Sequence, residues 1–389
     1  MIFKNNRFID SLIFISTFVI ILNFAYFVIE KSPVQYSDWL INYQGGFVRR
    51  GLPGEIFYQL NKFTNIPLDL IVFISISLLY IFFAINFVKL ARKIKFSFMN
   101  LLVFFSPLSF LYPLMEQKIS GRKDIIFIFS IIFLATYLEK LKFENQKYLI
   151  ILLILISTFS HTGFFVYVPI FFLIFLILNY RIPFKKIFIE LIFISFFSIV
   201  FFFLIFFNTS IDQNSINEIC KSIKEYLPSC GKSDYIETLN WSLKYEIELV
   251  TKIWNKENYI RFYTIAFLLA NLPLMYVFYK SKLNKKYLFD LNPVFIFILI
   301  SLFTFPIYFI GADYGRYMHL TYLSLLICYF KAISTKFLIV EKQSFYNIRK
   351  SLMFLIIILY GFTWTIPHCC NNNFKFIYQK PLSKIKNIN

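Results

Sequence analysis

The sequence predicts an all-α, polytopic membrane protein with about eleven transmembrane helices. Of its 389 residues, 58% are hydrophobic and 22% aromatic, and the mean hydropathy is +0.65. A soluble domain is usually about 45–50% apolar. Many apolar runs approach the roughly 20 residues that cross a bilayer. The connections between these runs alternate in charge, as the loops of membrane proteins do.

The first apolar run, at 9–29, follows the basic residues Lys4 and Arg7. It is too long for the core of a signal peptide, and no small-residue cleavage site follows it. We therefore expect a retained first helix with its N-terminus in the cytoplasm.

Ten further spans follow the first. The fifth and sixth come from one long run, Tyr148 to Tyr180, which His161, Thr162 and Gly163 interrupt. A turn at this point makes two helices. The predicted spans after the first are 67–88, 99–115, 124–138, 148–160, 162–180, 187–207, 259–279, 291–310, 317–334 and 351–367.

The distribution of basic residues tests this topology, because cytoplasmic loops are rich in Lys and Arg. With the N-terminus inside, every even connection is basic and carries few acids. Their basic residues are Lys89, Arg92, Lys93 and Lys95; Lys140, Lys142 and Lys147; Arg181, Lys185 and Lys186; Lys280, Lys282, Lys285 and Lys286; and Lys331, Lys336, Lys342, Arg349 and Lys350.

The odd connections are then extracytoplasmic, and the whole chain, 1–389, forms one integral membrane domain. These outer connections are 30–66, 116–123, the turn at His161, 208–258 and 311–316. The tail after His368 would also be outside, but its lysines fit that side poorly, and its side stays open.

The net charge of +19 would suggest a nucleic acid partner in a soluble protein. Here topology and the anionic cytoplasmic leaflet explain the Lys and Arg residues. No helix-turn-helix, zinc-finger or RNA-binding pattern is present. We expect membrane lipids as partners, and no nucleic acid.

The largest outer loop, 208–258, has apolar residues at mixed spacing among acids and lysines. We expect part of it to form an amphipathic helix on the membrane interface. Cys220 and Cys230 can form a disulfide in an oxidising compartment or remain free thiols. The five cysteines include no CxxC pair, so their spacing does not support a metal site.

The densest polar stretch is the first outer loop, with the sequence YSDWLINYQGGFVRRGLPGE at 36–55. Asp38 is either a solvated acid or helix N-cap, or a base that takes a proton from a sugar hydroxyl. Glu55 opens a short amphipathic segment and is expected to be a first-turn helix acid rather than a catalyst.

Between these acids lie a Gly45-Gly46 pair, which permits a tight turn with positive φ, and the pair Arg49 and Arg50. Two outer arginines oppose the charge rule. They either anchor lipid headgroups or hold phosphate through their planar guanidinium groups.

The second outer loop holds Arg122 and Lys123 in the sequence SGRKD. They either pair with Glu116 and Asp124 within the loop or form a second contact to a diphosphate. Ionisable residues at helix ends in a membrane are costly to place and are therefore functional candidates.

Three more candidates come from the last outer loop, and a fourth from the fifth–sixth turn. Asp313 and Arg316 can pair with each other at a helix start or line a cleft, and His319 lies one turn further on the same face. His161 is either a satisfied interhelical histidine or a proton relay or phosphate donor.

The loop topology places all these groups at one side of the membrane. Such a cationic pocket with a carboxylate suits a lipid-linked diphosphate and a hydroxyl nucleophile, because cations stabilise the charge that grows on a departing diphosphate. Asp38 is the expected catalytic base. No DxD, Walker or GxSxG sequence is present, and neither a metal nor a cofactor is expected.

The acid after the first helix, Asp38, followed by a short interfacial segment, resembles the layout of GT-C type membrane glycosyltransferases. The outer arginines Arg49, Arg50, Arg122 and Arg316, with the Phe- and Ile-rich spans, resemble bacterial O-antigen and capsule polysaccharide polymerases. The resemblance implies a bacterial inner-membrane enzyme. It would transfer or polymerise polyprenyl-diphosphate-linked oligosaccharides onto a glycan acceptor at the extracytoplasmic face.

Two other classes remain as alternatives. A lipid-linked oligosaccharide flippase would show a repeat and charges buried within its spans, and neither is evident in the sequence. A membrane acyltransferase that modifies glycans would need a His–acid pair, for which His161 or His319 is available.

Overall fold

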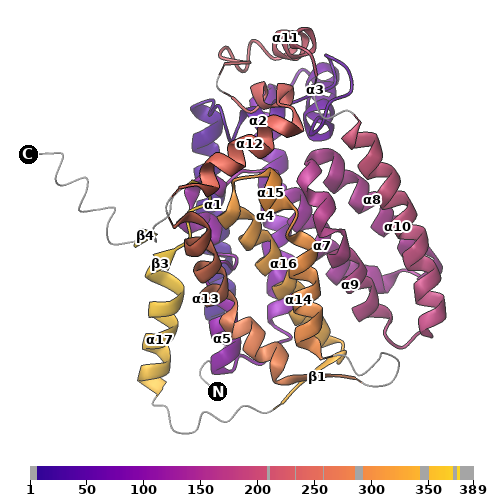
Figure 1. Cartoon of the computed structure of the whole chain (residues 1–389), viewed down its shortest axis with the longest axis vertical. Helices are drawn as coiled ribbons and strands as arrows, with labels where there is room; N and C mark the ends of the chain where they lie inside the picture. Colours follow the sequence, from indigo (N-terminus) through magenta and orange to yellow (C-terminus); the bar gives the residue numbers. More distant parts are fainter. Residues whose placement is uncertain are drawn as a thin grey trace, which may run out of the picture.

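The chain folds into a helical bundle covered at one end by a layer of short helices (Figure 1). The computed structural model describes residues 7–207, 211–232, 234–256, 258–284, 292–341, 350–370 and 375–376. Of the basic loop residues named above, Lys285, Lys286, Lys342 and Arg349 lie outside this part, as does the chain beyond 376.

The helices of the first half are α1 (Arg7–Ile29), α2 (Ser37–Leu40), α3 (Leu52–Thr64), α4 (Leu68–Ala91), α5 (Phe98–Phe104), α6 (Tyr112–Met115), η1 (Gln117–Ile119), α7 (Asp124–Tyr137), η2 (Leu138–Lys140), α8 (Phe143–Ser160), η3 (Thr162–Tyr167) and α9 (Val168–Asn179). The second half comprises α10 (Phe184–Phe206), α11 (Gln213–Ser222), η4 (Glu237–Asn240), α12 (Leu243–Trp254), α13 (Tyr259–Tyr279), α14 (Pro293–Thr304), α15 (Ile307–Ile310), α16 (Tyr314–Ser334) and α17 (Lys350–Phe362), with short strands β1 (Ser281–Leu283), β2 (Leu338–Val340), β3 (Trp364–Thr365) and β4 (Lys375–Phe376).

Six of the described helices are long and apolar enough to cross a membrane: α1, α4, the continuous η3–α9 segment, α10, α13 and the α14–α15 segment. The protein is therefore a mainly helical membrane protein, but the count of eleven spans is not confirmed. The expected span at 99–115 is a seven-residue helix, α5, followed by turns. Pro107 and Pro113 explain this break, because proline has no N–H to continue a helix.

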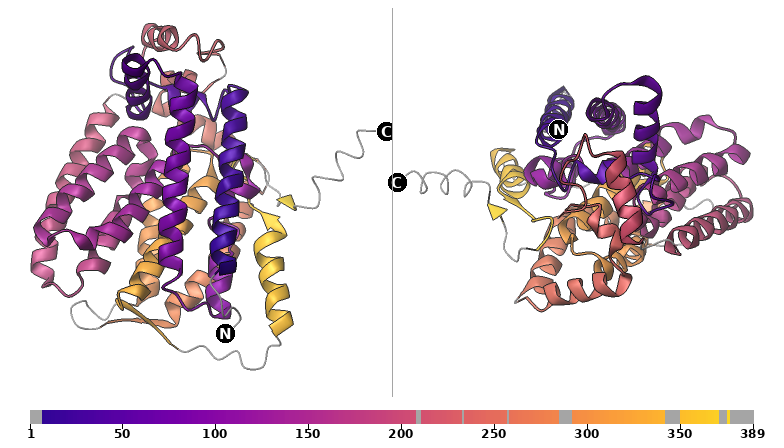
Figure 2. Two further views of the ribbon diagram at one scale, coloured as in Figure 1. Left: turned by 180° about the vertical axis from the view of Figure 1, so that it is seen from behind. Right: turned by 90° about the horizontal axis from the view of Figure 1, so that it is seen from above.

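The basic connections meet at one end of the bundle. Arg92 pairs with Asp10 at 2.8 Å, and Lys331 pairs with Glu139 at 2.8 Å. Strand β1 pairs with β2 in antiparallel register at this end, which is also the end where α1 begins (Figures 1 and 2). Arg92 and Lys331 thus lie at the end where α1 begins, as predicted for these two connections, while the side of the membrane stays a prediction.

The break at His161 is confirmed, because α8 ends at Ser160 and His161 has an extended backbone. Helix α16 lies in the centre of the bundle, and every residue from Tyr314 to Ala332 is buried. In contrast, α10 and α14 expose long rows of Phe, Ile and Leu. Apolar surface of that extent suits contact with lipid.

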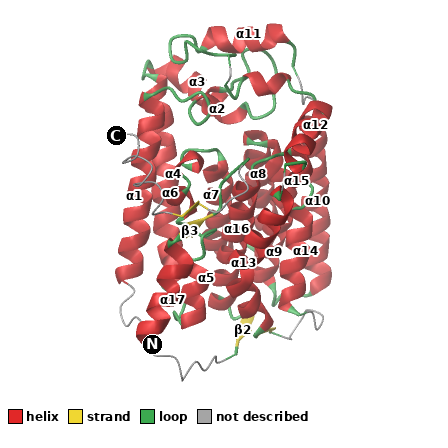
Figure 3. Cartoon of the chain, turned by 60° about the vertical axis from the view of Figure 1, so that its left-hand side comes forward, coloured by secondary structure: helices red, strands yellow, loops and turns green. Residues whose placement is uncertain are grey.

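The covering layer contains α2, α3, α11 and α12 (Figure 3), and η4 packs against α11. Cys220 and Cys230 form a disulfide within it. The expected amphipathic helix in 208–258 is α12, with Val250 and Ile253 buried and Leu243 exposed. The glycine pair makes its turn as predicted: Gly46 has φ +103°, and a Cβ on Gly45 would lie 2.1 Å from the Ser215 carbonyl oxygen.

Candidate functional site

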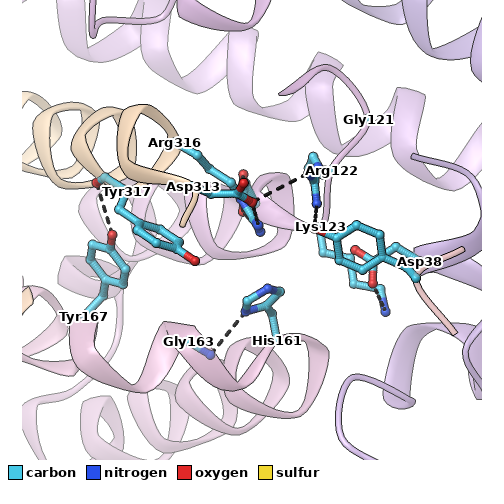
Figure 4. A network of polar contacts seen from close by, with 12 residues as sticks. Asp38, Gly121, Arg122, Lys123, His161, Gly163, Tyr167, Asp313, Arg316 and Tyr317 are labelled. Carbon is cyan, nitrogen blue, oxygen red and sulfur yellow. Dashed lines mark hydrogen bonds and ion pairs between the residues drawn. The ribbon is translucent and has the colours of Figure 1, made fainter. Parts of the chain in front are cut away.

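The candidate site lies under the covering layer, where the N-termini of α7 and α16 meet the first loop. Side chains from α2, from 121–123, from the turn at 161 and from 313–317 converge here (Figure 4). The loops brought together are the four predicted outer loops that carry the unusual polar residues.

Asp38 is fully buried on α2, so it is neither a solvated acid nor an N-cap. The N-cap position is Tyr36, directly before the helix, and its side chain makes no capping hydrogen bond. Asp38 Oδ1 lies 3.4 Å from Lys123 Nζ, which is also fully buried. Neither carboxylate oxygen has a hydrogen-bond donor among the described residues. Because a buried carboxylate normally accepts several hydrogen bonds, Asp38 keeps its acceptor capacity for another group.

Electrostatics keep Asp38 ionised. Burial alone would raise the pKa of Asp38, but the positive charges of Lys123, Arg50, Arg122 and Arg316 outweigh burial and lower it. For Lys123, burial lowers the pKa to about 8, against the opposing effect of Asp38. An ionised carboxylate in this position can accept a proton from a hydroxyl group.

Arg316 is held by two carboxylates. Its Nε and Nη2 donate to both oxygens of Asp124 at 2.6–3.0 Å, and its Nη1 donates to Asp313 at 3.2 Å. This fork geometry is the strong form of a guanidinium–carboxylate pair. The Asp313–Arg316 pairing considered from the sequence is present, but Asp124, from another loop, takes most of the donors of Arg316.

Arg122 and Lys123 do not pair within their own loop. Arg122 Nη2 lies 3.6 Å from Asp313, and Lys123 contacts Asp38 and donates to the Arg50 carbonyl at 2.7 Å. We use the name chamber for the cluster of polar side chains at this site, namely Asp38, Arg50, Arg122, Lys123, Asp124, His161, Asp313, Arg316 and Tyr317. This cluster is not simply cationic, as the sequence suggested, because its positive charges face carboxylates from different loops.

Arg50 has no carboxylate within ion-pair distance in the described part of the chain, and it is half-buried. Its backbone has φ 68°, a left-handed conformation that is rare for residues other than glycine. Its guanidinium carbon lies 5.6 Å from the centre of the Tyr235 ring, and that of Arg122 lies 4.7 Å from the same ring.

His161 points toward the space between Arg316 and Lys123 (Figure 4). Its Nδ1 accepts the Gly163 N–H at 3.1 Å, so its ring proton is on Nε2. Burial and four neighbouring cations lower the pKa of His161 well below its usual value. The side chain is thus a neutral N–H donor, which fits the phosphate-donor alternative better than the proton relay.

Three predicted or considered residues lie elsewhere. Arg49 turns away from the chamber and donates to Glu246 at 2.8 Å and to the Thr238 carbonyl at 2.7 Å. Glu55 accepts the Tyr43 N–H at 2.8 Å and holds the turn beside it, as expected for a structural acid.

His319 is the third of these residues. It lies deeper in the bundle, where its Nδ1 contacts the Leu108 carbonyl at 2.8 Å and its ring stacks on Tyr112.

Sequence reasoning missed Asp124 and Tyr235 as site residues, and did not consider the pair formed by Glu116 and His368. His368 Nδ1 lies 3.3 Å from Glu116, beside Asp313. Asp124 was visible as an acid at a helix start, directly after two cations. Nothing in the sequence around Tyr235 or His368 marked them.

An apolar groove of about 590 Å³ runs beside the chamber, between α13, α14, α15 and α16. Most of its lining residues are aromatic or aliphatic. Tyr308 and Tyr314 line the groove, and the Tyr308 ring packs 5.8 Å from the Tyr317 ring, which lies in the polar chamber. The groove and the chamber therefore share a wall of tyrosines.

The described residues contain no group of three or more His, Cys, Asp and Glu side chains arranged to hold a metal ion. Comparisons with known proteins gave no match: no family model, no curated protein and no solved structure corresponds to this chain.

Proposed function

We propose that this protein is a membrane glycosyltransferase that transfers or polymerises lipid-diphosphate-linked sugars onto a glycan acceptor. The observation that carries this proposal is the Asp38 carboxylate, which is buried and ionised and has the Lys123 ammonium, 3.4 Å away, as its ion-pair partner, while neither oxygen accepts a hydrogen bond of normal geometry from a described residue. It lies near guanidinium groups with unused donors. A base beside an anion site is what a hydroxyl nucleophile and a diphosphate leaving group require.

The proposed reaction is a single displacement. The acceptor hydroxyl oxygen bonds to the anomeric carbon while the bond from that carbon to the diphosphate oxygen breaks. The hydroxyl proton passes to Asp38, and the bonding electrons leave with the diphosphate. Arg50 and Arg122 stabilise that growing charge, and His161 donates a hydrogen bond from Nε2.

The apolar groove supports a polyprenyl chain as the lipid part of the donor. A polyprenyl chain in the bilayer is already out of water, so the groove would hold it by van der Waals packing and not by transfer from water. A chain bound beside Tyr308 and Tyr314 at the groove wall would lie within reach of the chamber. The lipid part of the donor would therefore contact the apolar groove, and its diphosphate would contact the adjoining charged chamber.

The decisive experiment uses purified protein in lipid nanodiscs with a polyprenyl-diphosphate oligosaccharide and a sugar acceptor. Product is measured by mass spectrometry as added sugar units. Transfer that depends on Asp38 supports the proposal. Transfer by Asp38→Asn at the wild-type rate refutes the assignment of the base.

The Glu116–His368 pair favours a second candidate, acyl transfer to a glycan, because an acid-paired histidine can act as a general base. The same reaction mixture, supplemented with an acyl donor, separates the two candidates. A mass gain of one acyl group without glycan growth would favour this alternative.

A further inference from the structure

The arginines of the chamber differ in how many of their donors are already used. Arg316 directs Nε, Nη1 and Nη2 at Asp124 and Asp313. In Arg50 and in the buried Arg122, by contrast, Nε has no hydrogen-bond partner among the described residues. Arg49 Nε also lacks a partner, but its Nη2 donates to Glu246 and to the Thr238 carbonyl, away from the other two arginines. Buried polar atoms are normally satisfied, so Arg50 and Arg122 are the groups at this site with a donor left for a ligand.

Both guanidinium groups converge on one side chain, Tyr235. The ring centre lies 4.7 Å from the guanidinium carbon of Arg122 and 5.6 Å from that of Arg50. Arg122 Nη1 also donates a hydrogen bond to the Tyr235 hydroxyl. Because that hydroxyl accepts from Arg122, its own proton remains available for an anionic oxygen.

The backbone around Tyr235 is fixed to the turn that carries the proposed base. Its N–H donates to the Pro33 carbonyl at 3.1 Å and to Ser37 Oγ at 3.2 Å, and Ser37 directly precedes Asp38. The Asp234 carboxylate accepts the N–H groups of the two residues after Tyr235 at 3.1 and 3.0 Å. Tyr235 is therefore positioned relative to Asp38 by the backbone and not by its ring contacts alone.

We propose that Arg50, Arg122 and the Tyr235 hydroxyl together bind the diphosphate of the donor, with Tyr235 setting the spacing of the two guanidinium groups. This inference rests on the proposed function and names the part of the site that holds the leaving group. Arg49, Lys123 and Arg316, which the sequence also suggested for this task, serve other contacts. Two guanidinium groups and one hydroxyl offer enough donors for two phosphate groups.

The test measures inorganic pyrophosphate binding to the full chain in nanodiscs by calorimetry, at constant ionic strength. We expect Arg50→Gln to weaken pyrophosphate binding at least tenfold. Tyr235→Phe removes one oxygen atom and should weaken it about tenfold, the size of one hydrogen bond to a charged group. Orthophosphate should bind more weakly than pyrophosphate, because it spans only one guanidinium group.

Two exposed residues near the same end provide matched controls, Arg261→Gln for loss of a cation and Tyr245→Phe for loss of a phenol oxygen. Both should bind pyrophosphate as the wild type does. Tyr235→Phe decides the outcome because it keeps the ring and is the variant expected to fold. Unchanged pyrophosphate affinity in Tyr235→Phe overturns the inference, whatever the result for Arg50→Gln.

The two proposals fail in distinguishable ways. If pyrophosphate binding depends on Tyr235 and Arg50 but the wild type transfers no sugar, the anion site stands and the glycosyltransferase proposal fails. If sugar transfer occurs and neither variant changes the KM for the lipid donor or the binding of pyrophosphate, the function stands and this assignment fails.

Discussion

Replacing Asp38 and Lys123 singly and together separates the stability of this pair from its chemistry. Both side chains are fully buried, and their charged atoms are 3.4 Å apart. At an effective dielectric constant of about 20, their attraction is about 5 kcal/mol, before the cost of removing both charges from water. Breaking a buried pair by removing one partner typically costs about 3–5 kcal/mol, because a charge is left uncompensated.

We expect Asp38→Asn and Lys123→Met each to lower the free energy of unfolding by about 3 kcal/mol or more. The double variant should lie within about 1 kcal/mol of the wild type, because no lone charge remains. Sugar transfer should behave differently. Asp38→Asn should lower the rate about 10²–10⁴-fold, and the second substitution should not restore it.

The assay pairs thermal unfolding in detergent micelles with sugar transfer in nanodiscs, for all four proteins. Recovery of transfer in the double variant would contradict the role of Asp38 as base. Additive losses of stability would contradict the buried ion pair itself. If Asp38→Asn proves too unstable to purify, the double variant still tests whether activity needs the carboxylate.

Three further predictions concern other parts of the molecule. Arg49→Gln should lower the free energy of unfolding by roughly 3 kcal/mol, since it leaves the Glu246 charge without its partner. It should leave pyrophosphate affinity unchanged. Differential scanning fluorimetry measures the loss of stability, and calorimetry measures the affinity. Cys220→Ser should destabilise the covering layer by about 2–3 kcal/mol, the size expected for a loop closed over ten residues. It should also speed proteolysis of that layer. If the wild type is cleaved at the same rate with and without reductant, the prediction is contradicted. Burial lowers the pKa of Lys123 to about 8 in the folded protein, so between about pH 8 and 10.5 the unfolded chain binds more protons and the free energy of unfolding rises with pH. In Lys123→Met, the part of this increase that comes from Lys123 should be absent. The measurement compares the free energy of unfolding of the wild type and of the variant across this pH range.

The presence of helices and of breaks between them was predictable because hydrophobicity and loop charge are local properties of the sequence. The break at His161 and the helix within 208–258 are examples. Helix lengths were less predictable. The apolar stretch at 99–115 has the composition of a span, but its helix ends at Phe104, and Pro107 lies in the turns that follow.

The gathering of charged loops at one end followed from the topology, but the pairing of their charges did not. Arg316 and Asp124 are 192 positions apart in the chain, and only the three-dimensional packing selects Asp124 over a nearer partner. Arg49 and Arg50 are neighbours that face different environments: Arg49 donates to Glu246, whereas Arg50 has a left-handed backbone and its guanidinium group lies near the Tyr235 ring.

The short length of α7 has a consequence for where a reaction would take place. Asp124 begins this helix, and Glu139, fifteen residues later (139 − 124 = 15), pairs with Lys331 at the basic end of the bundle. At 1.5 Å per residue, the chamber is about 22 Å from that end, whereas the hydrocarbon layer is about 30 Å thick. With the basic end at one membrane boundary, the chamber lies roughly 8 Å inside the other. A diphosphate headgroup would then have to sink below the level of its lipid neighbours, and water would have to follow it into the bilayer.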